Sequence, residues 1–187
     1  PGHGLSSGKP TAITTFQQYQ DAMNACLDVC KNNMPLPYHC VGQSTGSAVI
    51  IDRLKNGDPA ELVFDKVVLL SPLVRPKGWK SIVRIHSTIK PFIKVWSKWL
   101  SVDWISALKE WIPTIESGEC IKRKVLIVQG TGDNTVDWEH NVEVLKRLFS
   151  EVKIAYVEDA QHHLVNESLA KRASVFKVML TEIEGYS

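Results

Sequence analysis

Three short apolar runs most constrain what this chain of 187 residues can fold into. Residues 66–70, 124–128 and 153–157 are mostly apolar, and their apolar residues do not alternate regularly with polar ones. Such runs are typical of strands that are buried on both faces of a parallel sheet. Because stretches with helical periodicity lie between them, the sequence predicts an α/β fold, with a mostly parallel sheet flanked by helices.

The predicted helices come from apolar residues that recur every three or four positions. Residues 15–32 begin with a capping-box pattern at Thr15, and residues 47–54 form a second helix after a short apolar run at 38–41. A helix also follows each of the last two strands. The apolar face of the final helix is expected to consist of Leu169, Phe176, Met179 and Ile183.

Residues 72–123 interrupt this alternation and are predicted to be a helical insertion between two strands. Residues 74–124 contain eleven Lys and Arg residues but four Asp and Glu residues, so the insertion is basic. It is also rich in tryptophan, and we expect three of these side chains to line a pocket. The sequence thus divides into core at 1–71, insertion at 72–123 and core at 124–187. The three expected pocket residues are Trp96, Trp99 and Trp104.

The composition excludes several classes of protein. A formal net charge of +2 gives no reason to expect a nucleic-acid partner, and no apolar stretch is long enough for a membrane span. The four cysteines do not form a disulfide or zinc-binding pattern. We therefore expect them to be reduced and buried, which indicates a cytosol-like compartment.

Gly42-Gln-Ser-Thr-Gly46 matches the G-x-S-x-G pattern of a nucleophile elbow. In this elbow a sharp turn between a strand and a helix exposes a serine, and glycines avoid steric clashes around it. An apolar run precedes the pentapeptide and a helix follows it, as the elbow requires. The context favours Ser44 as a nucleophile over a simple Gly-Ser turn.

A serine hydroxyl needs a base within hydrogen-bonding distance, and the base needs an acid that fixes its tautomer. Asp133 follows the strand at 124–128, with Asp137 as the alternative acid, and both His162 and His163 follow the strand at 153–157. The carboxyl ends of parallel strands face the ligand in open α/β sheets. The order Ser, Asp, His is that of α/β-hydrolases. The residues alone leave the two histidines nearly tied.

These motifs resemble those of monoacylglycerol lipases and bacterial lysophospholipases in the α/β-hydrolase superfamily. Pro1 to Gly8 looks like the family's G-H-G loop, and residues 159–167, Asp-Ala-Gln-His-His-Leu-Val-Asn-Glu, look like its histidine segment. The resemblance implies an α/β-hydrolase fold in which residues 72–123 are a lid. Its register selects His162 over His163. Asp159 departs from the family, which usually has glycine there.

The resemblance also implies that the family's first strands, and one of its two oxyanion donors, precede the position of Pro1. We therefore expect this chain to be the C-terminal part of a longer protein, without the N-terminal part of the sheet. The backbone N–H of Thr45, the residue after the nucleophile, is the expected second donor. The strand at 38–41 is expected to have an unpaired edge.

The predicted function is serine hydrolysis of lipid-like carboxylic esters, such as lysophospholipid or monoacylglycerol, through an acyl-enzyme on Ser44. This reaction needs no metal and no organic cofactor. The basic, tryptophan-rich lid suits peripheral contact with a membrane. The alternative is that the tryptophans pack the lid onto the core and the lysines are simply solvated. Two alternatives remain: a proline-iminopeptidase-like peptidase and a non-catalytic module that binds an ester-like ligand. A peptidase needs carboxylates near a substrate amine, and the lid offers only Asp103, Glu110, Glu116 and Glu119.

Overall fold

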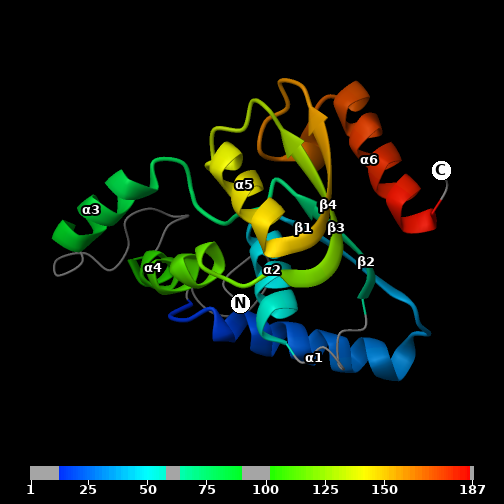
Figure 1. The fold of residues 1–187 in the computed structure, drawn as a ribbon, viewed down its shortest axis with the longest axis horizontal. Coiled ribbons are helices and arrows are strands. Elements are labelled where there is room, and N and C mark those ends of the chain that lie inside the picture. The colour runs from blue at the N-terminus through cyan, green and yellow to red at the C-terminus, as the bar shows by residue number, and fades with distance from the viewer. Residues whose placement is uncertain (1–12, 58–63, 90–101, 186–187) are drawn as a thin grey trace. The chain divides into compact units, whose positions relative to one another are not determined.

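The computed structural model describes residues 13–57, 64–89 and 102–185 (Figure 1). The chain divides into two compact units, and each is described by itself. The larger unit comes from residues 35–77 and 118–187, and the smaller from residues 1–34 and 78–117. The proposed nucleophile, acid and base all belong to the larger unit.

The larger unit contains a parallel sheet of four described strands in the order β1-β2-β3-β4. The strands β1 and β2 pair in parallel, as do β2 with β3 and β3 with β4. This topology confirms the predicted α/β class. The strand bounds are Tyr38–Gln43 for β1, Phe64–Leu70 for β2, Ile121–Gly130 for β3 and Phe149–Val157 for β4.

Helices cover both faces of this sheet, and Figure 1 shows α5 and α6 on opposite sides of β3 and β4. One face of β2 and β3 packs against α6 through a fully buried valine, Val175. Because strand side chains alternate between faces, the other buried residues of β2 and β3 face the opposite helices. The bounds are Thr45–Asn56 for α2, Trp138–Leu148 for α5, Leu164–Asn166 for the 3₁₀ helix η2 and Leu169–Glu184 for α6.

Burial differs between the strands in a way that the apolar runs did not predict. The carboxyl-terminal halves of β2 and β3 are continuously buried, as predicted for strands covered on both faces. The same prediction is wrong for β4, whose residues after Phe149 are exposed or half-buried. The reason is its position, since β4 is an edge strand of the described sheet. β1 is the other edge strand among the described residues.

The smaller unit contains α1 (Gln17–Asn33), α3 (Trp79–Ile89) and α4 (Val102–Glu116). Phe16 stacks on Trp111 of α4 with ring centroids 4.2 Å apart, and Trp104 Nε1 donates a hydrogen bond to the Tyr19 hydroxyl at 3.3 Å. The Gln18 side chain accepts from the Thr15 backbone N–H at 3.4 Å, which is half of the predicted capping box. The division of the chain into core and lid stays a prediction.

The cysteines are free, but the expectation that they are buried is wrong. Cys26 and Cys120 are exposed, and Cys30 and Cys40 are half-buried. Cys26 and Cys30 lie on the part of α1 after Gln20, where Leu27 is the one buried residue, so they do not belong to the buried face of this helix. None of the described helices is both long enough and apolar enough to cross a bilayer.

Candidate active site

Ser44 lies in the turn between β1 and α2. Its backbone φ is 54°, in the left-handed region that residues other than glycine rarely adopt. Hydrogen bonds hold this conformation, because the Ser44 N–H donates to the Leu70 carbonyl at 2.9 Å and the Leu73 N–H donates to the Ser44 carbonyl at 3.3 Å. The turn therefore has the strained strand-to-helix geometry of a nucleophile elbow.

The two glycines of the elbow differ in what they do. A Cβ atom at Gly42 would lie 2.6 Å from Cδ1 of Ile50 and 2.7 Å from the carbonyl carbon of Gly46, so no side chain fits there. A Cβ atom at Gly46 would meet nothing within 4 Å among the described residues. The expectation that glycine avoids a clash is therefore confirmed at Gly42 and wrong at Gly46.

His162 lies between Ser44 and Asp133 and is hydrogen-bonded to both. Its Nε2 lies 2.8 Å from the Ser44 hydroxyl oxygen, and its Nδ1 lies 2.8 Å from Oδ2 of Asp133. His162 and Asp133 are buried, whereas Ser44 is half-buried. The structure thus brings together the predicted nucleophile, base and acid from three loops at the carboxyl ends of β1, β3 and β4.

The carboxylate of Asp133 is held by several hydrogen bonds. Its Oδ1 accepts from the backbone N–H groups of Thr135 at 2.8 Å and Val136 at 3.3 Å, and Oδ2 accepts from His162. Burial alone would raise the pKa of Asp133, but these hydrogen bonds and the nearby imidazole outweigh burial, so the pKa lies below its usual value. The group is therefore a carboxylate at neutral pH. The alternative acid, Asp137, instead faces Arg75 at 3.8 Å.

The histidine segment keeps a tight shape without its usual glycine. Asp159 has φ of 51°, the left-handed conformation that glycine would adopt and that aspartate tolerates better than most residues. Its N–H donates to the Thr131 hydroxyl at 2.9 Å, and the carboxylate of Glu167 accepts from the Gln161 N–H. The first bond joins the histidine segment to the loop that carries Asp133, here called the acid loop. The second bond closes the histidine segment on itself, between its residues 161 and 167.

The neighbouring histidine faces a different partner. His163 Nδ1 lies 3.0 Å from Nε2 of Gln43, the residue before the nucleophile, and the rings of His162 and His163 meet edge to face with centroids 5.1 Å apart. The geometry thus separates the two histidines that the sequence left nearly tied. His162 bonds to Ser44, and His163 bonds to Gln43.

Residues 1–114, more than half of the chain, match the sequence family described as serine aminopeptidase, S33 (Hydrolase_4). The chain belongs to this family of hydrolases. This chain is also similar to a curated relative, the α/β-hydrolase domain-containing protein aho-3 of Caenorhabditis elegans, with 23% identity over 165 residues. That match covers 87% of this chain, which spans 41% of the length of the relative.

Solved structures resemble this S33 family member over its whole length. The monoacylglycerol lipase of Paleococcus ferrophilus superposes with a TM-score of 0.78 at 16% identity, covering 100% of this chain and 81% of that one. A monoglyceride lipase of Saccharomyces cerevisiae, solved with a substrate analogue, gives 0.73 at 14% identity, covering 100% and 75%. These likenesses show that the chain has the α/β-hydrolase fold, as the motifs implied.

One residue beside the acid was missed by the sequence analysis. Gln129 is fully buried at the end of β3, where its Nε2 donates to the Gly130 carbonyl at 2.9 Å and lies 3.4 Å from Oδ2 of Asp133. It therefore supports the same carboxylate oxygen as His162. The available signal was a polar side chain directly after the apolar run at 124–128.

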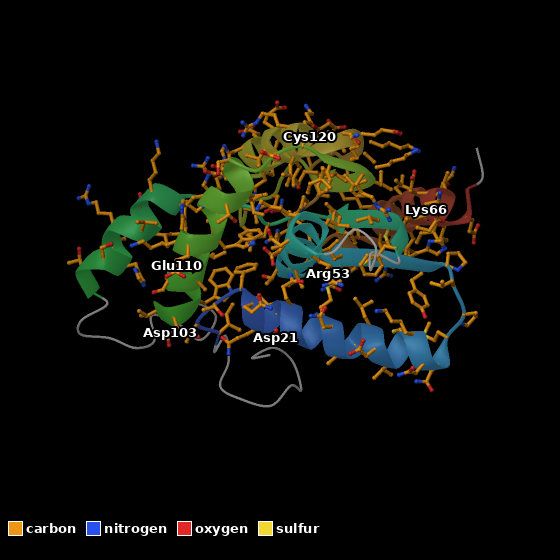
Figure 2. All side chains as sticks on the ribbon, turned by 60° about the horizontal axis from the view of Figure 1, so that its bottom comes forward. Asp21, Arg53, Lys66, Asp103, Glu110 and Cys120 are labelled. Atoms are coloured by element: carbon orange, nitrogen blue, oxygen red, sulfur yellow. The ribbon has the colours of Figure 1, made fainter. Side chains whose placement is uncertain are left out.

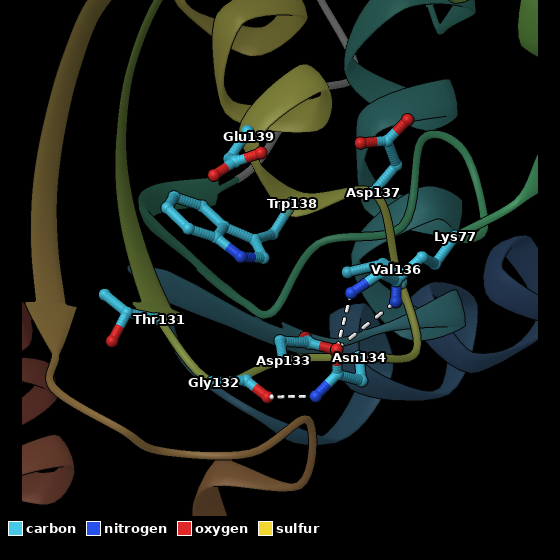
Figure 3. A pocket seen from close by; sticks show the side chains of 9 residues that line it. All are labelled: Lys77, Thr131, Gly132, Asp133, Asn134, Val136, Asp137, Trp138 and Glu139. Carbon is cyan, nitrogen blue, oxygen red and sulfur yellow. Dashed lines mark hydrogen bonds between the residues drawn. The ribbon is translucent and has the colours of Figure 1, made fainter.

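A polar cavity of about 240 Å³ lies beside the acid loop (Figure 3). Its lining includes Asp133 and the first turn of α5, with Asp137, Trp138 and Glu139, but neither Ser44 nor His162. In Figure 3 the Asn134 side chain reaches back to the Gly132 carbonyl, at 3.1 Å. Ser44, the predicted nucleophile, therefore does not line this cavity.

Of the three tryptophans expected to line a pocket, the structure describes one. Trp104 is buried, and its N–H donates to Tyr19 inside the smaller unit. Trp96 and Trp99 lie outside the described residues, as does the segment Pro1 to Gly8 that looks like the G-H-G loop. Within the described part of the chain, His, Cys, Asp and Glu residues form no group that could hold a metal ion.

Proposed function

We propose that the protein is a serine hydrolase that cleaves carboxylic esters of lipid-like substrates through an acyl-enzyme on Ser44. The observation that carries this proposal is the continuous hydrogen-bonded series from Ser44 through His162 to Asp133, with 2.8 Å on each side of the imidazole. The same arrangement of nucleophile, base and acid performs acyl transfer on several unrelated folds.

The proposed reaction has two halves. Ser44 attacks the ester carbonyl while His162 Nε2 takes the hydroxyl proton, and the imidazolium then gives that proton to the departing alcohol. In the second half His162 takes a proton from water, which attacks the acyl-enzyme, and returns it to Ser44. Throughout, Asp133 holds the Nδ1 proton and stabilises the positive charge on the imidazole.

Thr45 is the proposed source of one oxyanion hydrogen bond. It is the first residue of α2, where the backbone N–H groups have no acceptor within the helix. The partial positive charge at this end of the helix also favours a developing negative oxygen. We assign the second donor to a part of the protein outside the described residues.

The proposed substrates are monoacylglycerol or lysophospholipid. Two solved structures with this fold are a monoacylglycerol lipase and a monoglyceride lipase, which supports a lipid ester as substrate. The basic surface of α3 fits an anionic membrane that carries such lipids, because Lys80, Arg84 and Ile85 are exposed there. We therefore also propose that the lid contacts the membrane surface.

A second candidate function is an aminopeptidase of the proline-iminopeptidase type. The description of the matching family as serine aminopeptidase favours it. Such an enzyme needs carboxylates that bind the substrate's α-amine. Figure 2 shows Asp103 and Glu110 on α4, and both are exposed rather than gathered in a described pocket. The ester hydrolase therefore remains the first proposal.

Labelling with a fluorophosphonate tests the serine hydrolase proposal. The purified protein should form a covalent adduct at Ser44, located by peptide mass spectrometry, and Ser44→Ala should not. Hydrolysis of monoacylglycerol, lysophosphatidylcholine, p-nitrophenyl esters of several chain lengths and aminoacyl amides then compares the candidate substrates. An absent adduct would favour a non-catalytic binding module, and faster amide than ester cleavage would favour the peptidase.

A further inference from the structure

A second hydrogen bond runs beside the one between Ser44 and His162. Gln43 precedes the nucleophile, His163 follows the base, and Gln43 Nε2 lies 3.0 Å from His163 Nδ1. The bond between Ser44 and His162 measures 2.8 Å. The elbow and the histidine segment, which are distant in sequence, are therefore joined by two adjacent side-chain bonds.

We infer that Gln43 and His163 are positioning residues that keep His162 aligned with Ser44. This inference rests on the proposed function, because alignment matters only if Ser44 and His162 react. A misplacement of a catalytic group by a fraction of an ångström lowers the rate, and a second tie between the same two loops restricts that movement. The ring of His163 also packs edge to face on His162.

The environment of Gln43 favours this role over a purely structural one. Its side-chain oxygen is buried and has no hydrogen-bond partner among the described residues. A buried amide oxygen without a partner lowers stability, so an apolar side chain of similar size would suit folding at least as well. Within the described residues, the bond to His163 is the one hydrogen bond that the Gln43 side chain makes.

The exposure of His163 supports the same reading. His163 is exposed, whereas His162 beside it is buried. An exposed imidazole gives little stability through burial, and its hydrogen bond with Gln43 is at the surface. What this bond does provide is an additional restraint on the backbone that carries His162.

Five variants of the purified protein, four single and one double, test the inference by steady-state ester hydrolysis. Gln43→Met and His163→Leu each remove one partner of the bond, and His163→Asn retains an acceptor, because the asparagine side-chain oxygen takes the place of Nδ1. Gln161→Leu is the matched control, since it removes an exposed amide from the same segment. The double variant Gln43→Met/His163→Leu measures coupling between the partners.

We expect kcat to fall about threefold to tenfold in Gln43→Met and in His163→Leu, as for the loss of one neutral hydrogen bond, while KM stays within about twofold. The double variant should be no slower than either single variant. His163→Asn should recover most of the rate. Urea unfolding of Gln43→Met should show unchanged or higher stability, which a structural role would not give.

The inference is overturned if His163→Asn is as slow as His163→Leu, if the two losses multiply in the double variant, or if the rates do not change. Fluorophosphonate labelling of each variant distinguishes a failure of the positioning role from a failure of the proposed function. Adducts at Ser44 with equal rates in all variants would reject the positioning role alone. An absent adduct in the unmodified protein would reject the proposed function, and the positioning role with it.

Discussion

Asp133 and Asp137 lie four positions apart, and their surroundings give them different roles. Asp133 bonds to His162 at 2.8 Å, whereas Asp137 lies 3.8 Å from Arg75. Asp133→Asn keeps the shape of the side chain but favours the wrong tautomer of His162. We expect kcat for ester hydrolysis to fall about 10⁴-fold, as for other triads that lose this charge.

Asp137→Asn is the matched control for this loss. It removes a carboxylate from the same loop but no hydrogen bond to His162, so kcat should stay within about threefold of the unmodified value. Equal losses in the two variants would contradict the assignment of the acid. A small loss in Asp133→Asn together with a large one in Asp137→Asn would exchange the two roles.

The lowered pKa of Asp133 makes stability depend on pH in a defined direction. A carboxyl group whose pKa is lower in the folded state stabilises the fold above its unfolded pKa, about 3.9 for aspartate, and this contribution disappears as pH falls through the folded pKa. Asp133→Asn has no such proton. The excess unfolding free energy of the unmodified protein over this variant should therefore shrink as the pH falls below about 4.

Urea denaturation of both proteins from about pH 6 down to about pH 3 measures this difference, since other acidic groups titrate equally in the two. An excess that stays constant across this range would show that Asp133 has the same pKa in the folded and unfolded states.

Sequence reasoning identified the three residues of the proposed triad, which the structure brings together, but not the residues that hold them. Ser44 and Asp133 follow from local motifs at strand ends, and the structure places them on either side of His162. The choice between His162 and His163 needs side-chain directions, which spacing does not supply. The bond from Gln43 to His163 joins residues 120 positions apart, so no local pattern could reveal it.

At the scale of elements, the elbow depends on close approach between β1 and α2. Gly42→Ala would place a Cβ atom 2.7 Å from the Gly46 backbone, so α2 would have to shift, at a cost of about 1–3 kcal/mol in unfolding free energy. Gly46→Ala meets none of the described residues at the start of the helix and should be neutral or stabilising by up to about 1 kcal/mol. Urea unfolding of both variants checks this contrast, and equal destabilisation would contradict it.

The final helix shows why periodicity alone predicts only part of the buried face. Leu169 and Phe176 were expected in the core, but 74% and 43% of their surfaces are exposed. Val175 is instead fully buried, with Met179 and Ile183 packed beside it. Two apolar stripes on α6 fit the helical period, and only the position of the sheet decides which is buried.

This difference predicts unequal effects of truncation on α6. Val175→Ala removes two buried methyl groups and should lower the unfolding free energy by about 2 kcal/mol. Phe176→Ala removes a larger side chain from the surface and should change it by less than about 0.5 kcal/mol. Thermal or urea unfolding distinguishes the two variants. A larger loss of unfolding free energy in Phe176→Ala than in Val175→Ala would contradict the surface position of Phe176.

At the scale of the whole molecule, the uneven distribution of charge matters more than the net charge of +2. The helix α3 carries exposed Lys80 and Arg84 one turn apart, whereas Nε2 of the buried His86 donates to the Val102 carbonyl at 2.9 Å. Each basic residue close to an anionic membrane contributes about 1 kcal/mol to binding. Reversing one such charge should therefore weaken binding more than reversing a charge elsewhere.

Arg84→Glu should lower the partition coefficient onto vesicles that contain phosphatidylserine about tenfold or more, and added salt should shrink the difference. Lys177→Glu on α6 changes the net charge by the same amount and is also exposed, so it is the matched control. Co-sedimentation with anionic and with neutral vesicles measures both variants. If the two variants lose equal affinity, binding follows net charge, and α3 has no particular contact with the membrane. A loss confined to Arg84→Glu would instead show that α3 meets the membrane surface.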